Sequence, residues 1–191
     1  TVSAFALEAL REDLDIPVLG VIDPGAQAAV RATRSGRIGV IGTTGTVQSD
    51  RYRESIQSQD PDITVFSQAC PLLVPLAEEG WTTGDVPRAV ASTYLTPLLE
   101  NEIDTLVLGC THYPLLKEVI AQVAGEAVIL VDSADETAAV VQESLDALGL
   151  RCERPLIPQY RFLVSDAPAI FERVGQRFLG HVMHDAEWVN I

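Results

Sequence analysis

The chain has 191 residues, and its 27 aspartates and glutamates outnumber its 13 lysines and arginines, which gives a formal net charge of −14. This balance excludes a protein that binds nucleic acid electrostatically, because such binding needs clustered basic residues. Hydrophobic residues make up 47% of the chain and charged residues 21%, so a disordered chain is also excluded and a folded, soluble, acidic protein is expected.

The first predicted element is a helix over residues 3–10, which starts almost at Thr1. The sequence shows no charged and apolar leader pattern before this helix, and the only methionine is Met183, so we expect that Thr1 is not a translation start and that the chain is processed or a piece of a longer one. The longest apolar stretches, residues 18–22 and 127–131, are far shorter than the roughly 18 residues that cross a bilayer. The sequence therefore predicts no membrane span.

Short apolar runs then alternate with helical patterns along the chain. The runs predicted as strands are residues 17–22, 37–41, 63–66, 105–108, 127–131 and 160–164. The helices predicted between them are residues 26–33, 45–58, 72–79, 86–100, 113–123 and 135–148. The runs are nearly continuous in hydrophobicity, as in strands covered on both faces, so the pattern predicts a doubly wound α/β fold with a largely parallel sheet. Residues 151–159, which contain two prolines, are expected to be a surface connection.

Ligands of such sheets bind at the carboxyl ends of the strands, so the residues that follow each strand are the candidates for chemistry. Cys110 follows the run 105–108, and Pro114 fits the first turn of the next helix. A sulfur at a helix N-terminus is expected to have a pKa below the ordinary value of about 8.5, and His112 can exchange a proton with a nearby group. A buried structural cysteine is the alternative, and the local pattern does not decide between the two.

The loop after residues 37–41 is rich in small and hydroxyl-bearing residues, namely Gly42, Thr43, Thr44, Gly45 and Thr46. Its spacing matches neither a dinucleotide-binding GxGxxG loop nor a Walker loop. Backbone N–H groups at a helix N-terminus favour anions, so the loop is a candidate carboxylate site. Simple N-capping by Thr43 or Thr44 is the alternative.

Acidic, histidine and lysine residues elsewhere give weaker signals. Glu78 can act as a general acid or base or recognise an ammonium group, whereas Glu79 is expected to face solvent. His181 and His184 have a spacing compatible with metal binding but lack further ligands, so no metal site is predicted. Lys117 is the only lysine and is placed in a helix away from the strand ends, which disfavours pyridoxal phosphate as a cofactor.

The three cysteines, Cys70, Cys110 and Cys152, are widely separated and form no CxxC pair. This spacing argues against a disulfide framework and against a zinc ribbon. A reducing cytoplasm fits it best.

Residues 109–116, GCTHYPLL, resemble the second cysteine motif of the glutamate racemase family. The likeness continues in residues 17–25, 38–46, 70–80 and 162–180, in the family's order and spacing. The resemblance implies two pseudo-symmetric α/β domains with the substrate between them. Residues 20–131 would form the second domain, and residues 1–19 and 132–191 the remainder of the first. It also implies a homodimeric cytoplasmic enzyme in the full-length protein, which converts L-glutamate to D-glutamate for peptidoglycan synthesis.

The resemblance assigns roles to individual residues and implies no cofactor and no metal. The family inverts the α-carbon with two cysteines, one on each face. Cys110 would be one of the pair, with His112 as its nearby acid or base and Glu78 as a supporting polar group. The substrate would be held by His112 and by the threonines of three segments, namely Thr1, Thr43, Thr44, Thr46 and Thr111.

The family's other cysteine belongs to a Cys-Asn-Thr motif, and this chain opens at the threonine, Thr1. Cys70 matches a different family position and cannot replace that cysteine. The chain alone is therefore expected to be inactive or nearly so, with neither inversion nor rapid Cα exchange of L-glutamate in deuterated water. Its incomplete sheet is expected to expose an unpaired strand edge that promotes association with other chains.

Three alternative functions stay open. The first is racemisation of another small substrate of the superfamily, such as aspartate or a hydantoin. The second is a non-catalytic fragment that binds a small anion or a partner. The third and weakest is a Cys–His hydrolase, which would need an oxyanion site in addition.

Overall fold

The computed structural model describes residues 1–152, 159–181 and 183–190. The chain divides into two compact units, Thr1–Arg151 and Cys152–Ile191. Residues 1–19 and 132–151 therefore lie in the same unit as residues 20–131, and the predicted assignment of 1–19 and 132–191 to a domain of their own stays a prediction.

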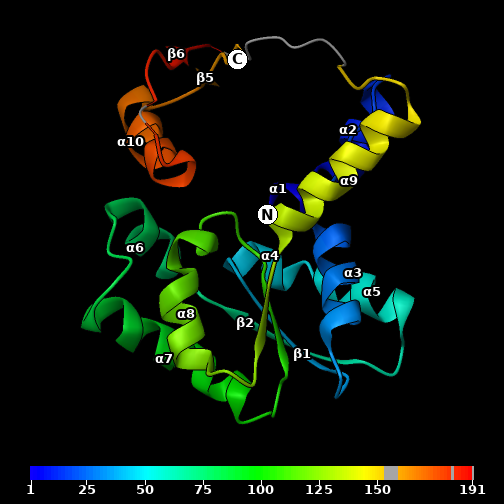
Figure 1. The fold of residues 1–191 in the computed structure, drawn as a ribbon, viewed down its shortest axis with the longest axis vertical. Coiled ribbons are helices and arrows are strands. Elements are labelled where there is room, and N and C mark those ends of the chain that lie inside the picture. Colours follow the sequence, from blue (N-terminus) through cyan, green and yellow to red (C-terminus); the bar gives the residue numbers. More distant parts are fainter. Residues whose placement is uncertain (153–158, 182, 191) are drawn as a thin grey trace. The chain divides into compact units, whose positions relative to one another are not determined.

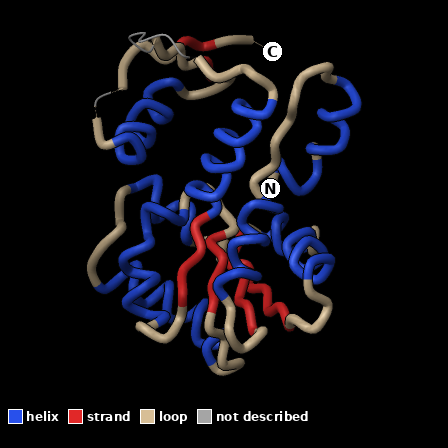
Figure 2. Tube along the Cα trace, turned by 45° about the vertical axis from the view of Figure 1, so that its right-hand side comes forward, coloured by secondary structure: helices blue, strands red, loops and turns tan. Residues whose placement is uncertain are grey.

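A four-stranded parallel sheet forms the centre of the first unit (Figures 1 and 2). Its strands, in the order β2-β1-β3-β4 across the sheet, are β2 (Thr64–Ala69), β1 (Arg37–Gly42), β3 (Thr105–Leu108) and β4 (Ile129–Asp132). Gly42 pairs with Ala69, and Leu108 pairs with both Ile41 and Asp132. The carboxyl ends of all four strands thus lie in one row, which confirms the predicted parallel sheet.

Helices cover both faces of this sheet, so the predicted doubly wound α/β architecture is also confirmed (Figure 1). One face is covered by α3 (Ile22–Ala32) and α5 (Arg51–Gln59), and the other by α6 (Leu73–Glu79), α7 (Asp85–Leu99) and α8 (Lys117–Ala124). Because strand side chains alternate between faces, β3 places Val107 in the core under α3 and α5 and Leu106 and Leu108 in the opposite core.

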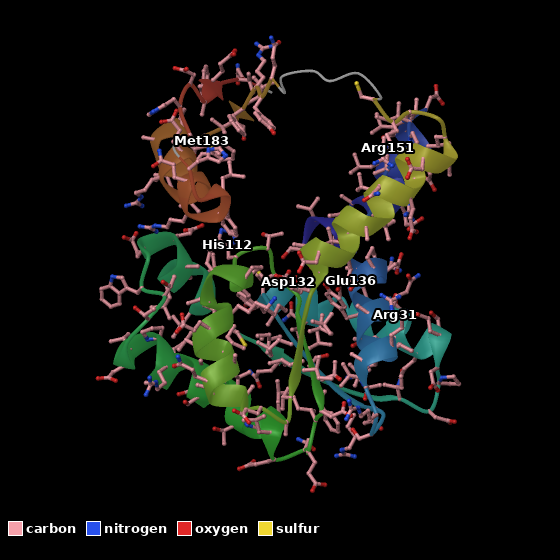
Figure 3. All side chains as sticks on the ribbon, in the orientation of Figure 1. Arg31, His112, Asp132, Glu136, Arg151 and Met183 are labelled. Carbon is pink, nitrogen blue, oxygen red and sulfur yellow. The ribbon has the colours of Figure 1, made fainter. Side chains whose placement is uncertain are left out.

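Five further elements complete the first unit, and four of them are short. The short ones are α1 (Val2–Phe5), α2 (Leu7–Asp13), α4 (Thr44–Gln48) and the 3-10 turn η1 (Tyr113–Leu116). The long helix α9 (Ser133–Ala147) follows β4 and packs against α3, where Arg31 and Glu136 form an ion pair of 2.6 Å (Figure 3).

The second unit is small. It contains the helix α10 (Pro168–Leu179) and a two-stranded parallel sheet of β5 (Leu163–Val164) and β6 (Glu187–Trp188). The strand predicted over residues 160–164 is therefore reduced to its last two residues. Most of the connection predicted over residues 151–159 lies outside the described residues.

Three sequence predictions are corrected in detail. Residues 17–22 form no strand, because the run is interrupted by Gly20 and the chain enters α3 at Ile22. The helix predicted over residues 45–58 is divided into α4 and α5 by Asp50, whose φ of 55° is left-handed. The helix predicted over residues 113–123 begins as the 3-10 turn η1 and becomes α-helical only at Lys117.

The Asp104 carboxylate, which directly precedes β3, holds the loop between α3 and β1 in place by hydrogen bonds. Its Oδ1 accepts a hydrogen bond from Thr33 Oγ1 at 2.6 Å, and its Oδ2 accepts the backbone N–H groups of Arg34 and Ser35, each at 2.7 Å. Partial burial opposes ionisation of this carboxyl, but the hydrogen bonds outweigh it and lower the pKa of Asp104 well below its usual range.

We expect Asp104→Asn to destabilise the chain by about 2 kcal/mol at neutral pH, because an amide cannot accept all three bonds and loses their charge assistance. A carboxyl with a lowered pKa stabilises the fold above its unfolded pKa of about 3.9, and that contribution fades as the pH falls further. The gap between variant and parent should therefore narrow below about pH 4. Urea unfolding at pH 7 and pH 3.5 measures this, with the exposed Asp62→Asn as the control; equal gaps at both pH values would contradict it.

Candidate active site

A cavity of about 340 Å³ lies at the carboxyl end of the sheet in the first unit. It is lined by residues that follow β1, β3 and β4, together with the start of the chain, the residue that precedes α3 and parts of α5 and α6. These residues are Thr1, Val2, Ser3, Val21, Thr43, Tyr52, Val74, Gly109, Cys110, Thr111, His112 and Ser133. The strand order reverses its direction between β1 and β3, which is where doubly wound sheets bind their ligands.

Cys110 enters this cavity from the turn that follows β3. The turn is anchored by Gly109, whose N–H donates to Ile41 O of β1 at 2.7 Å, and by Tyr113, whose N–H donates to Cys110 O at 3.1 Å. Cys110 is partly exposed. The alternative of a cysteine sealed in the core therefore does not hold for this residue.

His112 lies between Cys110 and Glu78. Its Nε2 is 3.2 Å from Glu78 Oε1, and its Nδ1 is 3.9 Å from Cys110 Sγ. A neutral imidazole that donates Nε2–H to the carboxylate presents Nδ1 to the sulfur as a proton acceptor. Glu78 comes from the last turn of α6 and is brought to the site by packing between α6 and η1. Figure 3 shows His112 beside α6.

The pKa of the Cys110 thiol is raised, contrary to the sequence prediction. Burial is the main cause, and it outweighs the backbone N–H groups of His112 and Tyr113, which act in the opposite direction. The predicted helix N-terminus is a four-residue 3-10 turn. Its few aligned peptide dipoles stabilise a thiolate less than a full helix would. Cys110 is therefore held as a thiol at neutral pH, with an acceptor within reach.

Three threonine hydroxyls form a cluster at the cavity. Thr1 and Thr43 line the cavity together with Cys110, whereas Thr46 is buried and is not one of the lining residues. Thr1 Oγ1 lies 2.7 Å from Thr43 Oγ1 and 3.1 Å from Thr46 Oγ1, and the last two oxygens are 3.0 Å apart. Thr43 also accepts the N–H of Thr46, so the predicted N-cap is confirmed for Thr43. Thr44 is exposed and, among the described residues, is not one that lines the cavity, whereas Thr111 does line it.

The other predicted side chains lie elsewhere. Cys70 is fully buried in the core that includes β3, and burial raises the pKa of its thiol to about 12. Glu79 is exposed, as predicted. His181 and His184 belong to the second unit, and the described residues contain no group of three or more His, Cys, Asp or Glu side chains arranged to hold a metal ion.

Sequence reasoning missed Tyr52 and Ser133, which both line the cavity. Ser133 directly follows β4, so the rule that selected Cys110 would have selected it too. It stands next to Asp132, whose carboxylate caps α9 by accepting Ala134 N–H at 3.0 Å and lies 3.8 Å from Lys117 Nζ. Tyr52 follows no strand, and only its contacts in the folded chain reveal it.

The thiol chemistry of this site predicts selective modification. We expect iodoacetamide to modify Cys110 far faster than Cys70, because Cys70 is sealed from solvent. Because burial raises the pKa of Cys110, its alkylation rate should keep rising above pH 8.5, with a midpoint higher than that of a cysteine in an unstructured peptide. Peptide mass spectrometry after timed labelling resolves the cysteines. A midpoint below that of the peptide cysteine would contradict the burial argument.

Comparisons with known proteins identify the family to which this site belongs. The model of the Asp/Glu/Hydantoin racemase family matches residues 1–141. A glutamate racemase of Geobacter metallireducens is 54% identical over 193 residues, which cover 100% of this chain and 71% of that protein. Similarity of this extent is far beyond what a shared fold alone produces.

Solved structures agree with the sequence comparison. A glutamate racemase isoform of Bacillus anthracis superposes with a TM-score of 0.92 at 40% identity, covering 99% of this chain and 70% of that one. The Francisella tularensis glutamate racemase, solved in complex with D-glutamate, gives a TM-score of 0.90 at 35% identity, covering 99% and 70% of the two chains. None of the helices in the described part of the chain has the length and apolar character needed to cross a bilayer. The chain belongs to the Asp/Glu/Hydantoin racemase family and, within it, to the glutamate racemases.

Proposed function

We propose that the protein, as its gene encodes it, interconverts L- and D-glutamate by proton transfer at the α-carbon, with Cys110 as the acid or base on one face of the substrate. The observation that carries the proposal is the placement of the Cys110 thiol in a cavity beside the Glu78–His112 pair. The family relationship supports glutamate as substrate, since relatives are glutamate racemases and one of them was solved with D-glutamate.

The proposed reaction is a pair of proton transfers. A base on one face removes the Cα proton and leaves the electron pair on a carbanion that the neighbouring carboxylate delocalises. An acid on the other face then supplies a proton to Cα, which inverts the centre and leaves the oxidation state unchanged. Cys110, held as a thiol by burial, supplies the proton in one direction. In the other direction its thiolate removes the proton.

His112 and Glu78 make that exchange reversible. When the Cys110 thiol passes its proton to Nδ1 of the neutral imidazole, it becomes a thiolate that can remove the Cα proton, and the imidazolium donates a hydrogen bond to that thiolate. Glu78 accepts from Nε2 and stabilises the positive charge of the imidazolium when it forms. His112 and Glu78 together thus allow Cys110 to alternate between its thiol and thiolate forms.

The threonine hydroxyls are proposed to hold the substrate. Thr1, Thr43 and Thr46 form a cluster of donors and acceptors, of which Thr1 and Thr43 line the cavity with Cys110, and Thr111 follows Cys110 in the chain and also lines it. Such groups bind a carboxylate or an ammonium group without adding a net charge to the cavity. Because the substrate has two carboxylates, we propose that these hydroxyls orient one of them so that Cα faces Cys110.

The wider biological role belongs to the same proposal. Proton transfer alone inverts Cα, so we propose that the reaction uses no cofactor and no metal. The product D-glutamate would serve peptidoglycan synthesis in the cytoplasm, and the working enzyme would be a homodimer.

The test is racemisation by the protein as its gene encodes it. L-Glutamate in deuterated water is followed by circular dichroism and by NMR. We expect the ellipticity to decay to zero while deuterium appears at Cα. L-Aspartate and a 5-substituted hydantoin are assayed in parallel. Faster turnover of either compound would reassign the substrate, and glutamate binding without exchange at Cα would identify a binding module in place of an enzyme.

A further inference from the structure

We propose that Tyr52 is a positioning residue for the proposed reaction, which holds the Cys110 turn through its ring and through a hydroxyl contact with Ser133. The inference rests on the proposed function of Cys110. Tyr52 belongs to α5, is only 3% exposed, and lines the same cavity as the cysteine.

The ring of Tyr52 occupies a space that two glycines leave open. A Cβ added to Gly109 would lie 3.0 Å from Tyr52 Cε2, and a Cβ added to Gly25 would lie 3.5 Å from Tyr52 Cε1. Gly25 belongs to α3 and Gly109 directly precedes Cys110. The ring therefore packs directly against the backbone of Gly109 and supports the turn that contains Cys110.

The hydroxyl group of Tyr52 reaches the start of α9. It lies near Ser133, the first residue of that helix, because a Cβ added to Gly25 would lie 3.6 Å from Tyr52 Oη and 3.1 Å from Ser133 Cβ, and the Ser133 side chain acts to lower the pKa of the phenol. Burial, together with the negative charges of Cys110, Asp132 and Asp23, raises the pKa of Tyr52 to about 12. The phenol stays neutral at physiological pH, so its part is to hold neighbouring groups in place and not to exchange protons. It links the turn after β3 to the turn after β4.

The position of the Cys110 turn is important because the contact between Cys110 Sγ and His112 Nδ1 is lost if the two atoms move slightly apart. Sγ and Nδ1 are 3.9 Å apart, close to the outer limit for a sulfur hydrogen bond. Misplacement of a reacting group by about 1 Å can cost about 10²-fold in rate. Without the Tyr52 ring against Gly109, the turn can move into the space that the ring occupied, and Cys110 Sγ can then move away from the imidazole of His112.

Two pairs of variants test the proposal through the alkylation rate of Cys110, which does not depend on turnover of glutamate. The protein is again the one its gene encodes. The first pair is Tyr52→Phe and Ser133→Ala, which preserve the ring and remove the hydroxyl contact from either side. We expect each to change the Cys110 alkylation rate by about threefold to tenfold, the scale of one polar contact, and the double variant to go no further.

The second pair is Tyr52→Leu and His112→Asn, which tests whether the ring acts through the sulfur–imidazole contact. In the parent, His112→Asn should shift the pH profile of Cys110 alkylation. In the Tyr52→Leu background it should produce little further shift, because that contact is already lost. Tyr94→Phe is the matched control, since it removes another tyrosine hydroxyl from the same unit. The Tyr94 hydroxyl lies on α7 and accepts Leu72 N–H at 3.4 Å.

Additive effects on Cys110 alkylation within either pair of variants would overturn the proposal. So would equal effects of Tyr94→Phe and Tyr52→Phe on the alkylation rate when the two variants have similar melting temperatures. If Tyr52→Leu fails to fold, the first pair still decides, because both of its members retain the buried ring. Failure of glutamate turnover with intact coupling in alkylation would count against the proposed function alone.

Discussion

Cys110→Ser is expected to lower kcat for glutamate racemisation by about 10³-fold, within the range that a general acid or base contributes. A serine hydroxyl is a much weaker acid than a thiol, and His112 cannot ionise it to a useful extent. The loss should appear mainly in kcat, with KM little changed, because the threonine hydroxyls that are proposed to hold the substrate remain in place. Enantioselective measurement of D-glutamate formed from L-glutamate gives both constants.

The matched control is Cys70→Ala in the same protein. Cys70 is fully buried, its thiol donates to Gln68 O at 3.5 Å, and burial raises its pKa to about 12. Its replacement should leave kcat within about twofold while lowering stability by about 1 kcal/mol. Substantial racemisation by Cys110→Ser, or loss of turnover in a folded Cys70→Ala protein, would refute the assignment.

Gly109→Ala is expected to cause the largest loss of stability of any single substitution in the site, about 3 kcal/mol. The new Cβ would lie 2.7 Å from Ile41 O and 3.0 Å from Tyr52 Cε2. Ile41 O belongs to the central strand β1 and accepts the Gly109 N–H, so it cannot retreat without breaking the sheet. Activity should fall as well, because the adjacent Cys110 would be displaced from His112.

Urea unfolding followed by far-ultraviolet circular dichroism measures this loss. Gly20→Ala is the control, because its Cβ would meet the far end of the Leu7 side chain at 2.5 Å, which can rotate away. We expect it to cost less than about 1 kcal/mol. Equal costs for the two variants would show that the backbone contact at Gly109 is not the cause.

The sheet could be predicted from the sequence because its strands are short, apolar and rich in β-branched residues. Residues 38–41 and 105–108 are buried on both faces, and such positions give continuous apolar runs. Cys110 and the Thr43 loop could then be selected, since chemistry gathers where parallel strands end. The residues that precede α3 look like a strand for the same reason, since an apolar run of this length does not distinguish a strand from a buried connection.

Other parts of the site depend on contacts that no local pattern contains. Glu78 lies 34 positions before His112 in the sequence, and only the packing of α6 against η1 brings its carboxylate to the imidazole. Tyr52 has the appearance of an ordinary core aromatic residue until Gly25, Gly109 and Ser133 are seen around it. The direction of the Cys110 pKa shift could not be predicted either, because it depends on burial and on the form of the turn that follows.

The register of the sheet sets a rule for how this protein can change in evolution. Leu108 pairs with Ile41 on one side and Asp132 on the other, so the lengths of three strands together determine where Cys110, Thr43 and Ser133 emerge. One residue inserted within β3 would turn every later side chain to the opposite face of the sheet. Insertions and deletions should therefore accumulate at the amino ends of the strands, far from the thiol, and leave strand lengths constant among active descendants.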